Sequence, residues 1–120
     1  MVDLMKQFKL PVLLVSRVGL GTLNHTLLTL YYLAQHGIPV AGVVLNDPDR
    51  CRDLSARSSP ATLEQWSSVP ILGNIPYRKG IRMTRGCGEE IARRVDRYVE
   101  VERISQVCRL GEKAHAGKGW

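Results

Sequence analysis

The sequence predicts an α/β fold in which a partial parallel sheet is covered by flanking helices. Two continuous apolar runs, at 12–15 and 40–45, and a third strand candidate at 69–76 are separated by stretches with helical spacing. Continuous apolar runs are typical of strands that are buried on both faces of a parallel sheet. The alternation of helix and strand along the chain therefore indicates a layered α/β fold.

The elements up to the second strand can be assigned in order. Residues 3–8 are predicted to form a short helix that ends before Pro11. A second helix over 23–34 follows from its apolar stripe, with Thr22 as the N-cap and Gly37 just beyond its C-terminus. This helix joins the first two strands, so the three form a βαβ unit with a right-handed crossover.

The rest of the chain is more polar. Residues 46–60 are predicted as a loop, followed by a helix over 60–66 that has a proline in its first turn. After the third strand, 78–88 is predicted as a basic loop and 89–110 as one charged helix, although 99–102 alternates like a strand.

Composition narrows the classes of protein. The 120 residues are enough for one domain, and 44% hydrophobic and 23% charged residues are typical of a globular chain. No apolar run is long enough for a membrane span, and the N-terminus lacks a secretory pattern. The cysteines, Cys51, Cys87 and Cys108, have no metal-ligand spacing, so we expect a reduced, cytoplasmic protein with no metal site and no disulfide framework.

The net charge of +6 lies mostly after residue 48. A basic second half could attract phosphates, nucleic acid or an acidic protein. A solvated charged surface explains the same composition.

The strongest local feature is the turn from Gly19 to His25, between the first strand and the second helix. Its glycines allow a tight turn, and the helix N-terminus could bind a carboxylate or phosphate with help from Thr22 and Asn24. Asn24 replaces the third glycine of G-x-G-x-x-G, and no P-loop lysine follows. A tight turn before a capped helix is the plainer interpretation.

Two further candidates follow strands. Asn46 and Asp47 come directly after the second strand, and Pro76, Tyr77 and Arg78 come after the third. Ligands of open α/β sheets bind at the carboxyl ends of strands, and an Asn amide can both donate to and accept from a purine edge. Ordinary turns at the strand ends remain the alternative.

Four stretches closely resemble the C-terminal half of the dethiobiotin synthetase family: 10–15, 19–29, 37–46 and 71–76. The stretch 19–29 is the part specific to that family, and the resemblance covers about residues 1–77. It implies the C-terminal half of a P-loop NTPase-like domain, and a cytoplasmic homodimer. It also implies a ligase that converts diaminopelargonic acid, CO2 and ATP into dethiobiotin in biotin biosynthesis, with Mg2+ bridging the nucleotide phosphates.

The resemblance also implies residue roles. Asn46 would read the adenine edge with Asp47 beside it, while Pro76, Tyr77 and Arg78 would line the ring.

A second set of roles concerns the substrate. Gly21, Thr22 and Asn24 would receive the carboxylate of diaminopelargonic acid across the dimer interface.

The sequence departs from the family in one respect: it contains no G-x-x-x-x-G-K-[ST]. In the family, the P-loop, the catalytic lysine and the magnesium-binding acid precede the matched region, so no catalytic residue is assigned here. We expect the chain alone to be inactive, with an exposed sheet edge and exposed apolar helix faces. It would be a truncated product or half of a split enzyme with a P-loop-bearing partner chain.

The sequence thus divides into a dethiobiotin-synthetase-like region, 1–77, and a region of unassigned role, 78–120, with a basic loop and a C-terminal helix. The alternative function is a non-catalytic module that binds a nucleotide or an acidic partner through the basic segment 78–97. Nucleic acid is not an expected partner under the ligase interpretation.

Overall fold

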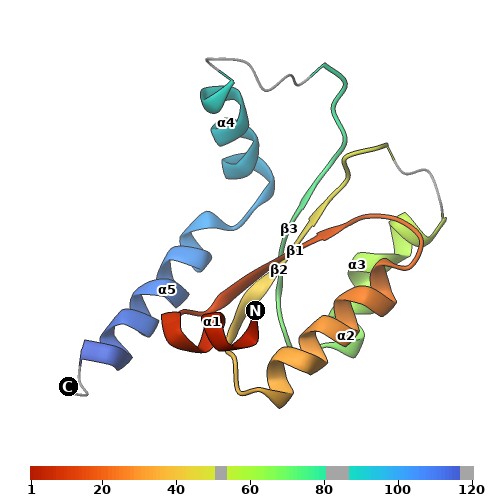
Figure 1. Ribbon diagram of the computed structural model, residues 1–120. Coiled ribbons are helices and arrows are strands. Elements are labelled where there is room, and N and C mark those ends of the chain that lie inside the picture. Colours follow the sequence, from red (N-terminus) through yellow and green to blue (C-terminus); the bar gives the residue numbers. More distant parts are fainter. Residues whose placement is uncertain (51–53, 81–86, 117–120) are drawn as a thin grey trace.

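The structure is a computed structural model, and it describes residues 1–50, 54–80 and 87–116. Three parallel strands lie in the order β1-β2-β3, with helices on both faces of the sheet (Figure 1). The elements are α1 (Val2–Phe8), β1 (Val12–Arg17), α2 (Thr22–Gln35), β2 (Val40–Asn46), α3 (Leu54–Trp66), β3 (Ile71–Ile75), α4 (Gly88–Tyr98) and α5 (Val101–Ala116). The predicted α/β class is confirmed.

The strand register aligns the carboxyl ends of the three strands. Arg17 at the end of β1 pairs with Asn46 at the end of β2, and Asn46 pairs with Ile75 at the end of β3. The segments that follow these three residues therefore leave the sheet at the same end, the carboxyl end of the strands. In open α/β sheets, ligands bind at this end.

One face of the sheet packs against α2 and α3. Val43 and Leu45 of β2 are fully buried there, in one cluster with Leu30 of α2 and Leu63 of α3. Each such apolar side chain contributes about 1.5–3 kcal/mol to folding. This cluster is the larger of the two described cores.

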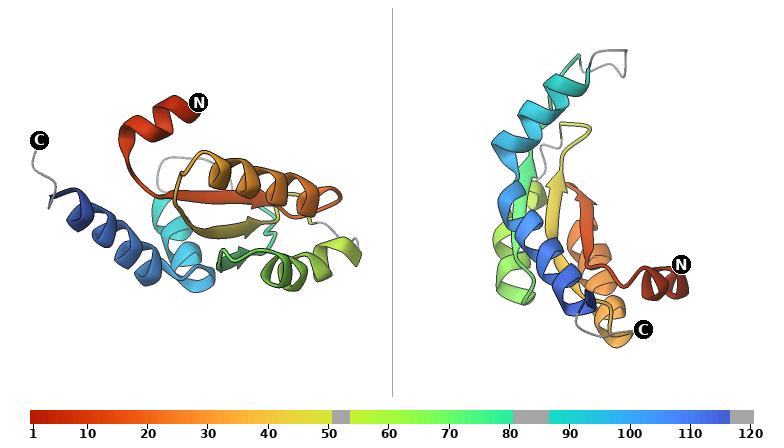
Figure 2. Two further views of the ribbon diagram at one scale, coloured as in Figure 1. Left: turned by 90° about the horizontal axis from the view of Figure 1, so that it is seen from below. Right: turned by 90° about the vertical axis from the view of Figure 1, so that its left-hand side faces the viewer.

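The opposite face is covered by α4 and α5 (Figure 2). Val44, between Val43 and Leu45 on β2, points into this second cluster together with Leu72 and Val99. Because successive strand residues point to opposite faces, β2 is buried on both sides. Its continuous apolar run has this cause.

The predicted single helix over 89–110 is wrong, because α4 and α5 are separate helices. Between them, the Glu100 N–H donates to the Leu72 carbonyl at 2.7 Å, and Val99 forms an antiparallel bridge with Gly73. The chain adopts an extended conformation at Val99 because this pairs its backbone with the free edge of β3 and buries the valine. The alternating pattern of 99–102 was the sequence signal for this break.

The predicted start of the third helix is also wrong. The helix α3 begins at Leu54, within the predicted loop, so Pro60 lies inside it. Proline removes one helical hydrogen bond. Leu63, which is 0% exposed, anchors the part of the helix that was predicted. The predicted basic loop 78–88 falls partly on residues 81–86, and the predicted loop 46–60 partly on 51–53, both outside the described residues.

Apolar side chains are exposed on β1 and α2, as expected from the sequence. In the described sheet β1 has a neighbour on one side only, and its Val15 side chain is 61% exposed. On α2, Leu28 and Tyr31 are exposed. None of the helices in the described part of the chain is long and apolar enough to cross a membrane.

Gly73 has no room for a side chain. A Cβ there would lie 2.4 Å from the Tyr98 carbonyl oxygen and 2.8 Å from the Val99 Cα. We expect Gly73→Ala to lower the free energy of unfolding by about 1–3 kcal/mol, because backbone must move to admit the methyl group. Urea unfolding of the purified chain measures the change.

Gly88→Ala is the matched control. Gly88 is the first residue of α4, and a Cβ added there would meet no atom of another residue packed against it within 4 Å. The unfolding midpoint of this variant should equal or exceed that of the original chain. Equal midpoints for the two variants would contradict the tight contact at Gly73.

Candidate functional site

The segments that follow β2 and β3 lie side by side. The Asp47 N–H, one residue beyond β2, donates to the Ile75 carbonyl at 2.9 Å. This bond continues the pairing of Asn46 with Ile75 and holds the two chain segments together as they leave the sheet. Residues about thirty positions apart in sequence therefore become neighbours, as the parallel register requires.

A small cavity of about 210 Å³ lies between these segments. Its lining residues are Asn46, Asp47, Pro48, Ile75, Pro76, Tyr77, Arg78 and Arg94. All five residues predicted from the strand ends border this one cavity, which we call the strand-end pocket. It combines an amide, a carboxylate, two guanidinium groups and an aromatic ring, so it can bind a flat molecule with polar edges.

Arg94 of α4 was not predicted. Its Nη2 atom donates to the Pro76 carbonyl oxygen at 2.6 Å. In the sequence, Arg94 is one of three arginines on a charged helix, and neither motif nor spacing distinguishes it from Arg93 or Arg97. Only the packing of α4 against the sheet brings it to the pocket.

Arg78 joins the strand-end pocket to a second, more basic cavity. It forms an ion pair with Glu90 at 3.1 Å, and both side chains are about half exposed. The second cavity has a volume of about 530 Å³ and is lined by Arg78, Glu90, Arg93, Arg94, Arg97 and Tyr98. Four positive charges against one carboxylate make it a site that favours anions.

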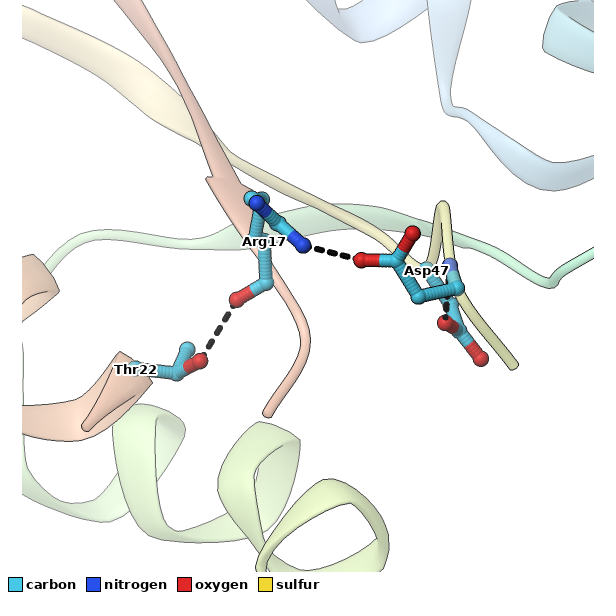
Figure 3. Close-up of polar contacts among 4 residues, drawn as sticks. Arg17, Thr22 and Asp47 are labelled. Carbon is cyan, nitrogen blue, oxygen red and sulfur yellow. Dashed lines mark hydrogen bonds and ion pairs between the residues drawn. The ribbon is translucent and has the colours of Figure 1, made fainter. Parts of the chain in front are cut away.

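The turn before α2 has the glycine conformations expected of it. Gly19 and Gly21 have φ values of 147° and 83°, which residues other than glycine rarely adopt. The helix N-cap is Gly21, so the prediction of Thr22 as N-cap is wrong by one residue. The Thr22 hydroxyl instead donates to the Arg17 carbonyl at 2.6 Å, as Figure 3 shows. It is therefore turned back to the end of β1 and does not cap the helix.

The predicted carboxylate residues are separate from the strand-end pocket. A wider groove of about 590 Å³ runs beside this turn and β1, and of Gly21, Thr22 and Asn24 only Thr22 lines it. Asn24 lies exposed in the first turn of α2. The two predicted sites thus lie at the same end of the sheet, the carboxyl end of the strands, but border different cavities.

A chain of polar contacts connects the two sites. Arg17, at the groove, forms an ion pair with Asp49. The Asp49 N–H donates to the Asp47 carboxylate at 3.2 Å, and Asp47 lines the strand-end pocket (Figure 3).

Magnesium, which the resemblance implies, has no ligand set in the described part of the chain. Within residues 1–50, 54–80 and 87–116, no three His, Cys, Asp or Glu side chains come together in a way that could hold a metal ion. The described residues therefore contain no metal-binding cluster of their own.

Comparison with known families defines the class of this protein. A family model described as an AAA domain matches residues 1–85, which include the whole sheet and the strand-end pocket residues up to Arg78. The chain therefore belongs to the AAA domain family, whose P-loop NTPase-like fold agrees with the observed α/β layers.

The curated relatives are more specific. The ATP-dependent dethiobiotin synthetases BioD of Bacillus cereus (strain AH820) and Bacillus anthracis (strain CDC 684 / NRRL 3495) are each 33% identical over 108 residues. That of Bacillus thuringiensis (strain Al Hakam) is 32% identical over the same length. In each case the match covers 90% of this chain and 43% of the relative. The resemblance to dethiobiotin synthetases is confirmed, and the chain spans less than half the length of these relatives.

The Thr22 hydroxyl gives a test of the turn geometry. We expect Thr22→Val to lower the free energy of unfolding by about 1–2 kcal/mol, because it removes a hydrogen bond from a residue that is 6% exposed. Thermal or urea unfolding measures this loss.

Thr29→Val removes a similar hydroxyl-to-carbonyl bond on the exposed side of α2 and serves as the control. Its effect should stay within about 0.5 kcal/mol. Equal losses for both variants would show that the bond to Arg17 has no special role.

Proposed function

We propose that this chain supplies the nucleotide-base and substrate-carboxylate recognition of an ATP-dependent dethiobiotin synthetase. This enzyme is the ring-closing ligase that forms dethiobiotin from diaminopelargonic acid, CO2 and ATP. The observation that carries the proposal is the strand-end pocket, because its five predicted residues converge from two separate segments in a chain whose curated relatives are dethiobiotin synthetases.

In this proposal the strand-end pocket receives adenine. The Asn46 amide offers one donor and one acceptor, which match the N7 acceptor and N6 donor of the adenine edge. Tyr77 and Pro76 provide a largely apolar wall for the ring, and Asp47 provides an acceptor beside Asn46. The pairing of Asp47 with Ile75 holds these groups in place before the nucleotide arrives.

The second recognition site is the first turn of α2. Its backbone N–H groups at Gly21, Leu23 and Asn24 would hold the carboxylate of diaminopelargonic acid, with the Asn24 amide adding a hydrogen bond. The Thr22 N–H is already bonded to the Gly19 carbonyl at 3.2 Å. The Thr22 hydroxyl takes no part, since it is bonded to Arg17. The exposed Leu28 and Tyr31 on the same helix support a homodimer in which this turn faces a second copy.

The phosphate chemistry is assigned to other residues. The 120-residue sequence has no P-loop motif, and the described residues hold no magnesium ligand set. In the proposal, a P-loop-bearing segment or partner chain binds the ATP phosphates and Mg2+. The odd number of cysteines supports a cytoplasmic setting.

Base recognition predicts a specific effect of Asn46. We expect Asn46→Ala to raise the Kd for ATP about tenfold, because a well-placed amide pair contributes about 1–3 kcal/mol of discrimination. An NMR titration of the chain with ATP measures Kd for each variant.

Asn74→Ala is the control, since Asn74 is exposed on β3 and does not line the strand-end pocket. It should leave the Kd for ATP unchanged. Equal effects of the two substitutions would contradict the assignment of Asn46 to the base.

The missing phosphate chemistry gives a second prediction. The purified chain should form no measurable dethiobiotin, because nothing in its sequence supplies a P-loop. Co-expression with the P-loop-bearing part of a curated relative should produce activity in a dethiobiotin assay. Turnover by the chain alone, at a rate near that of a complete relative, would refute this division of roles.

A second candidate function is supported by the basic cavity. Four arginines surround it, so the chain could act as a non-catalytic module that binds a nucleotide or an acidic protein through residues 78–97. Arg82 and Arg85, also in this segment, lie outside the described residues. In the same titrations, binding that falls steeply with salt but is unaffected by Asn46→Ala would favour this candidate.

A further inference from the structure

We propose that Arg94 is a positioning residue of the strand-end pocket, which holds Pro76, Tyr77 and Arg78 in the conformation that forms the pocket wall. These three residues are called the pocket strip below. The inference rests on the proposed function for the identity of the ligand, but the positioning role itself is a property of the ligand-free chain.

The pocket strip needs support because it lies beyond the sheet. The strand β3 ends at Ile75, whose carbonyl accepts the last bond from the β2 side, from Asp47. Pro76 has no N–H, so its carbonyl is the group through which its backbone can be held. Arg94 Nη2 donates to that carbonyl at 2.6 Å.

The arginine is itself well anchored. Its helix, α4, is fixed to the sheet by Val95 and by the bridge between Val99 and Gly73. The guanidinium carbon lies 5.7 Å from the centre of the Tyr98 ring, within cation–π range. The charged group is therefore held from two sides and presented to the strip, where a charged donor forms a stronger bond than a neutral one.

Arg94 also differs from its neighbour on the helix. Its side chain is partly buried, and it lines both the strand-end pocket and an apolar cavity of about 380 Å³ between α4 and the sheet. Arg93 does not line the strand-end pocket: it borders the basic cavity and forms an exposed ion pair with Glu89 at 3.2 Å. The two adjacent arginines therefore form a matched pair for a test.

A second contact supports the same role for α4. Arg78, the last residue of the pocket strip, is paired with Glu90, one turn before Arg94. The helix α4 thus holds the pocket strip at both ends: Arg94 binds the Pro76 carbonyl, and Glu90 binds the Arg78 side chain. Arg94 lies beyond residues 1–85, so the family match does not assign it.

The test uses Arg94→Met, Arg94→Lys and the control Arg93→Met in the full 120-residue chain. The first readout is the NMR backbone order parameter of Tyr77 and Arg78 without ligand. We expect Arg94→Met to lower it from about 0.85 to below about 0.6, as the strip becomes mobile. Arg94→Lys should restore part of the order, because lysine keeps a charged donor, and Arg93→Met should have no effect.

The second readout is the Kd for ATP. Arg94→Met should raise it about tenfold, the effect of losing one charge-assisted hydrogen bond. Arg93→Met should raise it less, because it removes a charge from the basic cavity but no bond to the pocket strip. Asn46→Ala should weaken ATP binding without loosening the strip, which separates direct contact from positioning. Equal order parameters in Arg94→Met and Arg93→Met would overturn the positioning role. Failure of the original chain to bind ATP would instead refute the proposed function, while the order parameters still decide the role of Arg94.

Discussion

The parallel pairing of β2 with its two neighbours is the constraint on which the rest of the structure depends. The strand β2 is buried on both faces, with Val43 and Leu45 in one core and Val44 in the other. Shifting this strand by one residue would exchange the side chains that face the two cores, so their close packing favours this register. The register in turn places Arg17, Asn46 and Ile75 side by side at the carboxyl end of the sheet. The strand-end pocket is a direct consequence.

The second layer of helices extends this arrangement beyond the residues of the family match. The chain between α4 and α5 pairs with the edge of β3, and Gly73 allows this close approach because it has no side chain. That pairing fixes the position of α4, and α4 brings Arg94 and Glu90 to the residues after β3. A backbone contact at one edge of the sheet therefore determines the shape of a pocket at its end.

The two recognition sites have different physical foundations. The strand-end pocket is assembled from strand ends that the sheet holds rigidly, while the turn before α2 depends on the positive φ values of two glycines. The polar contacts from Arg17 through Asp49 to Asp47 link the two. In the proposed enzyme, these polar contacts would connect the adenine site with the carboxylate site directly, without passing through the P-loop-bearing part.

Local sequence patterns predict the α/β class, the three strands and the five strand-end residues that border the strand-end pocket. These follow from local patterns, because continuous apolar runs mark buried parallel strands, and ligand residues follow such strands. Local patterns also located the turn at Gly19 and Gly21, but they could not show that the Thr22 hydroxyl is bonded to Arg17.

Long-range packing fixes the break between α4 and α5, which the sequence signals only by the alternation at 99–102, and it also fixes the early start of α3 and the position of Arg94. Helical spacing continues through Val99, and pairing with β3 overrides it because an otherwise open strand edge gains a backbone hydrogen bond. The helix α3 extends back from Pro60 to Leu54, although a proline inside a helix removes a hydrogen bond, and local patterns do not predict this extension. Arg94 and Arg93 are equivalent in the sequence, and they differ only because the packing of α4 turns one toward the sheet and the other toward solvent.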